Sequence, residues 1–146
     1  MIREAKPKDI NKIIELGTES LRVNDHYSEL RIDVNKIRQA AHEVVSGGNN
    51  FAWVSENSNG EVVGAVCGLS HPIMFHERNQ LSILLYYCRE PGDGGLLIRK
   101  IVRWWKTRPG IKMCVVCLEE GSDPRIGEIL AKAGLEKRLP TFVGVK

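Results

Sequence analysis

The chain has 146 residues, of which 42% are hydrophobic and 27% charged, and its formal net charge is +3. This length fits one domain with one real core, and the composition excludes a disordered or fibrous chain. No apolar run approaches the about 18 residues of a membrane helix, and the first residues are charged where a signal peptide would be apolar. We therefore expect a soluble, cytoplasmic protein that does not bind membranes.

The first third of the chain predicts a short strand followed by two helices. The strand spans residues 2–5, and Pro7 then suits the first turn of a helix. Apolar residues recur at helical spacing over 10–21. After a polar break at 24–28, Asp33 can cap a second helix, which ends at a Gly-Gly pair.

The middle of the chain predicts three strands. The first two, 51–56 and 61–69, flank Asn59-Gly60, and this dipeptide is the strongest short signal for a hairpin. His71-Pro72 ends the second strand or bends it. The third strand spans 80–88, and its continuous apolar run predicts burial on both faces.

The last third predicts a strand between two helices. A glycine-rich turn over 89–95 leads into a helix over about 96–107, and a strand over 111–118 follows. Either Ser122 or Asp123 caps the next helix, which has a proline in its first turn.

The order of these elements defines the predicted fold class. Gly134 lies just past the last helix, and a final strand spans 141–145, which gives the order β-α-α-β-β-β-α-β-α-β. The sequence contains no internal repeat and no linker long enough to divide domains. We predict a single α/β domain over residues 1–146, with a mixed, mostly antiparallel sheet flanked by helices.

The four cysteines do not predict a metal site. Cys114 and Cys117 match the spacing C-x-x-C, but they fall on the predicted strand 111–118. Residues three apart on a strand point to opposite faces, so the two thiols cannot share a metal or a disulfide. A second pair of cysteines with zinc spacing does not occur in the sequence. We expect structural thiols in a reducing compartment.

The glycine-rich turn carries the chemical signal of the sequence. Gly92, Gly94 and Gly95 let a ligand touch the main chain, and the free N–H groups of the following helix start favour phosphate. A Walker loop is excluded because Leu96 stands where that motif needs lysine. A dinucleotide fingerprint is excluded because Leu97 stands where its third glycine is required.

The pattern Arg89-x-x-Gly92-x-Gly94 resembles the Q/R-x-x-G-x-G/A element of GNAT-superfamily acyltransferases. With the order of elements, the resemblance covers nearly the whole chain, and residues 129–135 are also similar to the family. The segment from His71 to Phe75 is similar to compact acetyltransferase-like proteins of some bacteriophages. The resemblance implies an N-acetyltransferase that moves an acetyl group from acetyl-CoA to a primary amine of a small molecule or protein by direct attack. It also allows a homodimer.

The resemblance also implies where the ligands lie. The cofactor would be bound by the strand end and the turn, namely Tyr87, Cys88, Arg89, Gly92, Asp93, Gly94, Gly95 and Leu96. Main-chain N–H groups of the turn would hold the pyrophosphate, and one at the strand end would polarise the thioester. Side chains that could reach further phosphates are Arg89, Arg99, Lys100 and Arg103. The acceptor would lie between the first two helices and the strand ends, near Asp25, His26 and Tyr27.

The catalytic acid and base do not follow from the resemblance. Many members carry a glutamate on the long strand and a tyrosine on the last helix, but this chain has no carboxylate over 80–88, and Leu130 or a neighbour stands at the tyrosine position. The candidates that remain are Tyr86, Tyr87 and His71, with His76 and Glu77 as weaker alternatives. An alternative function is therefore a degenerate member that keeps the fold and coenzyme A binding as a binding or structural module.

The helix over 96–107 is basic, but a nucleic-acid partner is not expected. Its cations more often form a solvated face, and they comprise Arg99, Lys100, Arg103 and Lys106, with Arg108 beyond the helix. Stacking on bases needs exposed rings, whereas Trp104 and Trp105 are expected to pack against the sheet.

Overall fold

The structure is a computed structural model and describes residues 1–24, 27, 30–118 and 123–138. Its elements follow the predicted order as far as the last helix. They are β1 (Ile2–Glu4), the 3-10 helix η1 (Pro7–Asp9), α1 (Ile10–Val23), α2 (Val34–Val45), β2 (Phe51–Glu56), β3 (Val62–Pro72), β4 (Asn79–Cys88), α3 (Gly94–Lys106), β5 (Ile111–Val115) and α4 (Pro124–Lys132). The strand predicted over 141–145 lies outside the described residues.

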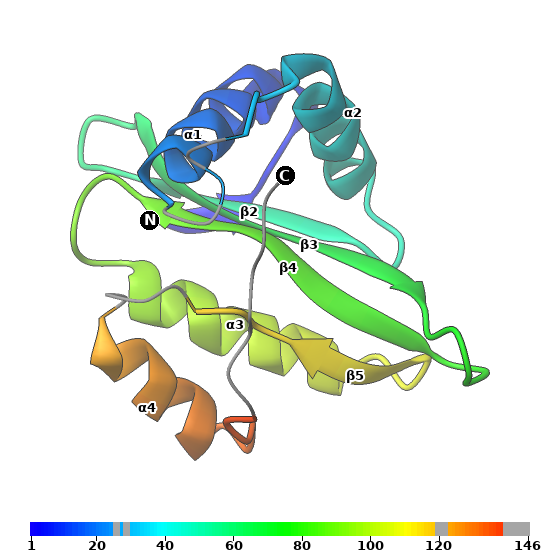
Figure 1. The fold of residues 1–146 in the computed structure, drawn as a ribbon. Helices are drawn as coiled ribbons and strands as arrows, with labels where there is room; N and C mark the ends of the chain where they lie inside the picture. Colours follow the sequence, from blue (N-terminus) through cyan, green and yellow to red (C-terminus); the bar gives the residue numbers. More distant parts are fainter. Residues whose placement is uncertain (25–26, 28–29, 119–122, 139–146) are drawn as a thin grey trace.

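The strands form one sheet in the order β1-β2-β3-β4-β5. Neighbouring strands are antiparallel except β4 and β5, which are parallel. Helices α1 and α2 cover one face of the sheet, and α3 and α4 cover the other (Figure 1). This confirms the predicted α/β fold, in which helices flank a mixed, mostly antiparallel sheet. None of the described helices is long and apolar enough to span a membrane.

Local signals in the sequence account for the element boundaries. The carboxylate of Asp33 accepts hydrogen bonds from the amides of Asn35 and Lys36, so it caps α2 as predicted. The carboxylate of Asp123 caps α4 in the same way, by accepting from the amide of Arg125. Gly134 follows α4 with φ of +93°, a conformation that favours glycine and ends the helix.

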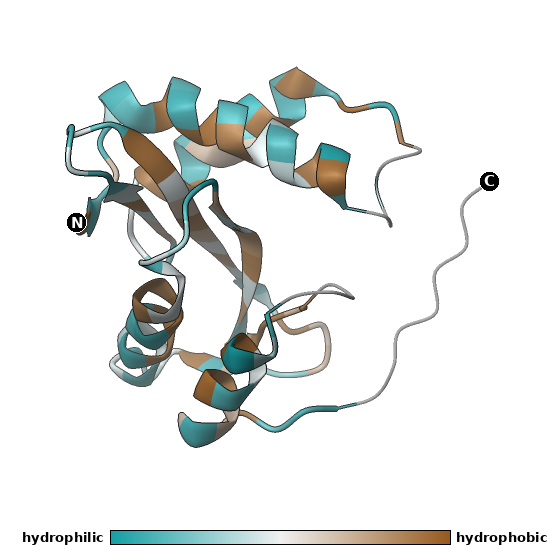
Figure 2. Cartoon of the chain, turned by 90° about the vertical axis from the view of Figure 1, so that its left-hand side faces the viewer, coloured by the Kyte–Doolittle hydropathy of each residue, from teal (hydrophilic) through white to brown (hydrophobic). Residues whose placement is uncertain are grey.

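Each face of the sheet has its own hydrophobic core. On the α1 and α2 side, the buried residues are Ile10, Ile13, Ile14, Leu16, Ala41, Val44, Ala52, Val54, Ala65, Cys67 and Leu85. On the α3 and α4 side, they are Phe51, Trp53, Val66, Leu81, Leu97, Ile98, Ile101, Val102, Ile111 and Leu130. Adjacent residues of β2 alternate between the two cores, as strand geometry requires. The hydropathy colouring in Figure 2 shows that the helices are amphipathic.

The two tryptophans of α3 pack toward the sheet, as predicted. Trp104 makes an edge contact with Phe51 at 4.9 Å between ring centroids, and Trp105 donates from Nε1 to the carbonyl of Ile111 at 3.0 Å. The Lys100 ammonium lies 5.0 Å from the centroid of the Trp53 ring. These contacts give the cations and rings of α3 a structural role.

The prediction that 80–88 is buried on both faces is wrong for much of β4. Only Leu81 and Leu85 are buried, whereas Leu84 is 48% exposed. The pairing with β3 shifts register here, because Cys67 pairs with Leu85 and the next residue of β3 pairs with Ile83. Leu84 is therefore the extra residue of a β-bulge, which bends the strand and exposes this side chain.

Strand β5 accompanies β4 over only part of its length. The paired residues of β4 run from Asn79 to Ser82. Within the described part of the chain, residues 83–88 have no strand partner on this side of β4. The bulge at Leu84 thus coincides with the point where the two parallel strands part.

Candidate functional site

The turn between β4 and α3 needs glycine at two positions for different reasons. Gly92 has φ of +145°, a backbone conformation that L side chains rarely adopt. At Gly94, an added Cβ would lie 2.5 Å from the hydroxyl oxygen of Tyr86, so any side chain would force a displacement. The glycines therefore keep the main chain of this turn bare and close to the end of β4.

Five consecutive amides, from the turn into the start of α3, have no acceptor among the residues that the structure describes. The first helical hydrogen bond of α3 runs from the amide of Leu97 to the carbonyl of Asp93, at 2.9 Å. The amides of residues 92–96 donate no hydrogen bond to any residue that the structure describes. They lie at the positive end of the helix dipole, which makes this turn a suitable seat for a phosphate or pyrophosphate.

Asp93 leaves these amides free because its side chain points elsewhere. An aspartate at the N-cap normally accepts from the second or third amide of its helix. Asp93 occupies the N-cap of α3 but makes no such bond. Its carboxylate accepts instead from the hydroxyl of the buried residue Ser55 on β2, at 2.5 Å, and this hydrogen bond lowers the pKa of Asp93. The N-terminal ammonium of Met1 also lies 3.3 Å from this carboxylate, so Ser55 and Met1 together hold a negative charge away from the helix start.

Arg89 is already committed within the protein. Its amide donates to the carbonyl of Val63 at 2.9 Å, and its guanidinium forms ion pairs with Glu15 and Glu19 of α1. These contacts lower the pKa values of both carboxyl groups, with the Arg89 hydrogen bond as the largest cause. Arg89 thus ties the end of β4 to α1, and its amide is not among those available to a pyrophosphate.

The end of β4 presents its own amides to the side that β5 leaves open. Hydrogen-bonded and non-hydrogen-bonded residues alternate along an antiparallel pair. Because the amide of Arg89 points to β3, that of Tyr87 does too, and those of Tyr86 and Cys88 point away from β3. These two amides face the side on which the described chain has no strand beyond Ser82.

Tyr86 and Tyr87 lie on opposite faces of the sheet, as their adjacency in a strand predicts. Tyr86 packs against the α3 and α4 core, and burial is the main cause that raises its pKa to about 12. Tyr87 packs against the α1 and α2 core. Cys88 is half-buried on the α3 side, and burial raises its pKa to about 11. Of these three, the hydroxyl of Tyr86 lies against the start of α3.

The remaining predicted residues occupy separate places. His71 of β3 lies beside β4, with Nε2 at 2.9 Å from the hydroxyl of Ser82, where β4 and β5 part. The ring of His76 accepts from the amide of Arg78 in the β3–β4 loop, and its neighbour Glu77 is exposed. The side chain of Tyr27 is 46% exposed. Asp25 and His26 lie outside the described residues.

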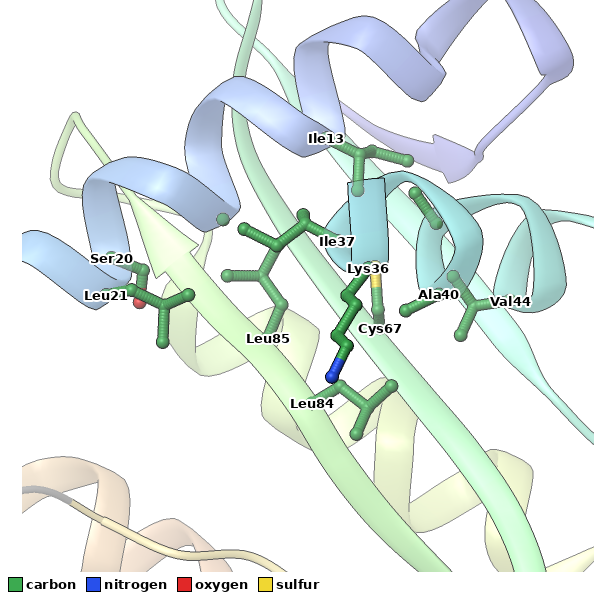
Figure 3. A pocket seen from close by; sticks show the side chains of 12 residues that line it. Ile13, Ser20, Leu21, Lys36, Ile37, Ala40, Val44, Cys67, Leu84 and Leu85 are labelled. Carbon is green, nitrogen blue, oxygen red and sulfur yellow. The ribbon is translucent and has the colours of Figure 1, made fainter. Parts of the chain in front are cut away.

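A pocket of about 290 Å³ opens between α1, α2 and the bulged part of the sheet. Its lining comprises Ile13, Gly17, Ser20 and Leu21 of α1, Lys36, Ile37, Ala40, Ala41 and Val44 of α2, Cys67 of β3, and Leu84 and Leu85 of β4. In Figure 3, the Lys36 side chain extends across the pocket toward Leu84. The acceptor site expected near Asp25, His26 and Tyr27 stays a prediction, and none of these residues lines the pocket as the structure describes it.

Comparisons with known proteins identify the fold. No family model matches the chain, and no curated protein sequence is significantly similar to it. Among solved structures, a predicted acetyltransferase with acetyl-CoA from Clostridium acetobutylicum has a TM-score of 0.70 at 17% identity, covering 100% of this chain and 95% of that one. A possible acetyltransferase from Clostridium difficile 630 has a TM-score of 0.67 at 14% identity, covering 100% and 97%.

A third similar structure is an aminoglycoside acetyltransferase from an uncultured soil metagenomic sample, with a TM-score of 0.64 at 17% identity and coverage of 100% and 98%. The chain therefore has the fold of GNAT-type acetyltransferases, which confirms the fold expected from the sequence. The similarity of residues 71–75 to bacteriophage proteins stays a prediction.

Three features of the site were not predicted from the sequence: the contact of Ser55 with Asp93, the contact of Glu15 with Arg89, and the place of Lys36 in the pocket lining. Ser55 lies 38 residues from Asp93, and Glu15 lies 74 residues from Arg89, so only the folded chain brings these pairs together. Lys36 resembles any other exposed lysine of an amphipathic helix. The single available signal was the helical spacing of Lys36 and Ala40, which places both on one face of α2.

Proposed function

We propose that this chain is an N-acetyltransferase that takes an acetyl group from acetyl-CoA and transfers it to a primary amine. The observation that carries the proposal is the run of five amides over 92–96, at the start of α3, that are unpaired within the described part of the chain. The bare main chain at Gly94 and the dipole of α3 fit a pyrophosphate group. The similar acetyltransferase structures support the same reading.

In this proposal the amides over 92–96 hold the pyrophosphate, and Asp93 contributes its main chain only. The amides of Tyr86 and Cys88 border the space beside β4 that β5 leaves open, and they can hydrogen-bond the pantetheine arm. When bound, acetyl-CoA supplies the electrophilic thioester. An amide of β4 aimed at the thioester oxygen would stabilise the negative charge that develops there.

The chain must also deliver a neutral amine. An alkyl amine with a pKa near 10.4 is neutral at only about one part in a few thousand at pH 7. His71, whose ring contacts Ser82 near the parting of β4 and β5, is our candidate to accept the proton. Tyr86 is a phenol that is protonated at neutral pH, and burial raises its pKa further, so we assign it the role of proton donor. Tyr87 is the alternative donor on the α1 and α2 side.

A coenzyme A titration by calorimetry followed by a thiol-release assay tests the proposal. Free thiol should form from acetyl-CoA only when a primary amine is added. His71→Gln should lower kcat by roughly tenfold or more while leaving coenzyme A affinity unchanged, since general base catalysis contributes about 10²–10⁴-fold. His76→Gln is the matched control, because that ring belongs to the β3–β4 loop.

The second candidate function is a binding module without catalysis. It is favoured because the glutamate and the tyrosine that many family members use are absent from β4 and α4. Strand β4 carries no carboxylate, and Leu130 of α4 is buried in the α3-side core. A chain that keeps coenzyme A binding as a binding module would show heat of binding in the titration and no thiol release with any amine. That pair of results would replace the enzymatic proposal.

A further inference from the structure

The pocket between α1 and α2 has a mostly apolar lining. Ten of its twelve lining residues are Ile, Leu, Val, Ala, Gly or Cys, and the other two are Ser20 and Lys36. Among the lining residues that the structure describes, none carries a carboxylate. A ligand in this pocket must therefore bring an apolar body, because polar groups buried here would lose their hydrogen bonds.

The volume of the pocket limits the size of that body. At about 290 Å³ it lies at the lower end of the range of about 300–1,000 Å³ that holds drug-sized ligands. The floor is formed by Leu84 and Leu85, and the walls by α1 and α2 (Figure 3). A single aliphatic or aromatic side chain fits this space better than an extended sugar or a polyamine.

Lys36 adds one positive charge to this apolar surface. Its ammonium makes no ion pair or hydrogen bond with any residue in the described part of the chain. In Figure 3, the Lys36 side chain runs from α2 in the direction of Leu84, and both residues line the pocket. An unpaired cation over an apolar pocket is complementary to a ligand that has an anionic group next to an apolar body.

The position of the pocket connects it to the proposed reaction. Leu84 lines the pocket and is also the bulged residue, two positions after the last residue of β4 that pairs with β5. The amides of Tyr86 and Cys88 follow within the next four residues. A ligand with its side chain in the pocket and its anionic group on Lys36 therefore has its remaining substituent near the parting of the strands.

Resting on the proposed function, we infer that the acceptor is an α-amino acid with an aliphatic or aromatic side chain. The side chain occupies the pocket, the carboxylate pairs with Lys36, and the amino group lies at the parting of β4 and β5. The transfer forms the amide bond to the amino nitrogen and breaks the thioester carbon–sulfur bond. Starting from the neutral amine, the proton lost by the nitrogen ends on the leaving thiolate sulfur, and the products are an N-acetylamino acid and coenzyme A with a free thiol.

The lining also argues against polycationic acceptors. Aminoglycosides and polyamines need carboxylates for several ammonium groups. Glu15 and Glu19 of α1 do not line the pocket and are both held by Arg89. Lys36 would repel a further cation, so these amines are expected to be poor substrates.

The test compares two ligands that differ only in charge, N-acetyl-L-leucine and N-acetyl-L-leucinamide. Their binding to the full chain is measured by saturation-transfer NMR and calorimetry, without coenzyme A. We expect the carboxylate to bind about twofold to fivefold more tightly, because Lys36 is exposed and an exposed ion pair contributes little. Lys36→Met should remove this preference, and Lys132→Met, a change on α4, should keep it. Ala40→Leu should weaken both ligands by filling the pocket.

A turnover assay with acetyl-CoA completes the experiment. L-Leucine and L-phenylalanine should give a higher kcat/KM than isoamylamine, phenethylamine or spermidine, and Lys36→Met should erase that order. Equal binding of the two leucine derivatives, or an unchanged preference in Lys36→Met, would overturn the inference. Coenzyme A binding with acetylation of other amines would then leave the proposed function standing. A carboxylate preference without coenzyme A binding would instead support the pocket and remove the acetyltransferase proposal.

Discussion

Leu84 and Leu85 are consecutive in the chain, yet both side chains line the pocket on the α1 and α2 side of the sheet. Adjacent residues of a regular strand point to opposite faces, so this pair marks the β-bulge in β4. In a regular strand, residues four positions apart lie on the same face of the sheet. The extra residue of the bulge reverses the faces of the residues that follow it, so Leu81 and Leu85 belong to different cores. It also lies next to the point where β4 and β5 part.

The two leucines of the bulge should differ sharply in their contribution to stability. Leu85 is 9% exposed and Leu84 is 48% exposed. We expect Leu85→Ala to lower the free energy of unfolding by about 2–4 kcal/mol, because it leaves a cavity in the core. Leu84→Ala should cost about 1 kcal/mol or less, since much of its surface is already in water. Urea denaturation of both variants measures this, and equal losses would contradict the bulge assignment.

Gly94→Ala should weaken coenzyme A binding through a steric conflict with Tyr86. The new Cβ would lie 2.5 Å from the Tyr86 hydroxyl oxygen and 3.6 Å from the ring carbon that carries it. We expect affinity to fall by roughly tenfold or more, as one or two charge-assisted hydrogen bonds are displaced.

Removing the hydroxyl provides the control for that variant. The double variant Gly94→Ala/Tyr86→Phe should recover most of the affinity, because the closest conflicting atom is gone. Gly110→Ala should have no effect, since a Cβ there meets no atom within 4 Å. Calorimetric titration of the four proteins measures these affinities, and a double variant as weak as Gly94→Ala would refute the steric explanation.

Ser55→Ala should weaken coenzyme A binding indirectly, through the Asp93 carboxylate that Ser55 binds. Without the Ser55 hydroxyl, the Asp93 carboxylate can turn to its own helix and accept from the amides at the start of α3. That places a negative charge in the phosphate seat, and we expect affinity to fall about tenfold. The stability should change by about 1 kcal/mol or less, because the new cap offsets the lost hydrogen bond.

The double variant Ser55→Ala/Asp93→Ala separates this charge effect from a general loosening of the turn. It has no carboxylate to move, so it should bind coenzyme A better than Ser55→Ala alone. Calorimetry on both variants gives the comparison. If the double variant were the weaker of the two, the role assigned to the Asp93 charge would be wrong.

Asp9 should make stability depend on acid pH. Arg3 donates hydrogen bonds to its carboxylate at 2.7 and 3.0 Å, and these lower the pKa of Asp9 from its ordinary value of 3.8. A carboxyl whose pKa is lower in the folded chain stabilises above the unfolded value, and this stabilisation is lost as pH falls through the folded value.

Asp9→Asn should therefore flatten the acid limb of the stability curve. We expect the variant to be about 1–3 kcal/mol less stable than the wild type at pH 7. It should lose less stability than the wild type between pH of about 5 and 2. Urea denaturation at fixed pH values provides the curves, and parallel curves would show that Asp9 does not titrate as the Arg3 contact implies.

Local sequence signals predicted most of the fold, because they act over a few residues. Asp33 caps α2, Asn59 and Gly60 form part of the turn between β2 and β3, and Gly134 ends α4, all as predicted. The glycine-rich turn was predicted on the same basis, and the amides of residues 92–96 donate to no residue that the structure describes.

Features that depend on one residue of register or on distant contacts were not predicted. The apolar run over 80–88 looks the same with or without a bulge, so periodicity could not reveal the exposure of Leu84. The pairing of Arg89 with Glu15 and Glu19 joins segments more than sixty residues apart. That pairing changes the predicted role of Arg89 from phosphate contact to a link between β4 and α1.

An NMR titration of ¹⁵N-labelled protein with coenzyme A observes each amide separately and so tests whether the start of α3 binds the pyrophosphate. We expect the largest shift changes on the amides of residues 92–96, with smaller changes at Tyr86 and Cys88. Saturating coenzyme A that leaves the amides of 92–96 unchanged, or shifts only residues remote from the start of α3, would contradict this expectation.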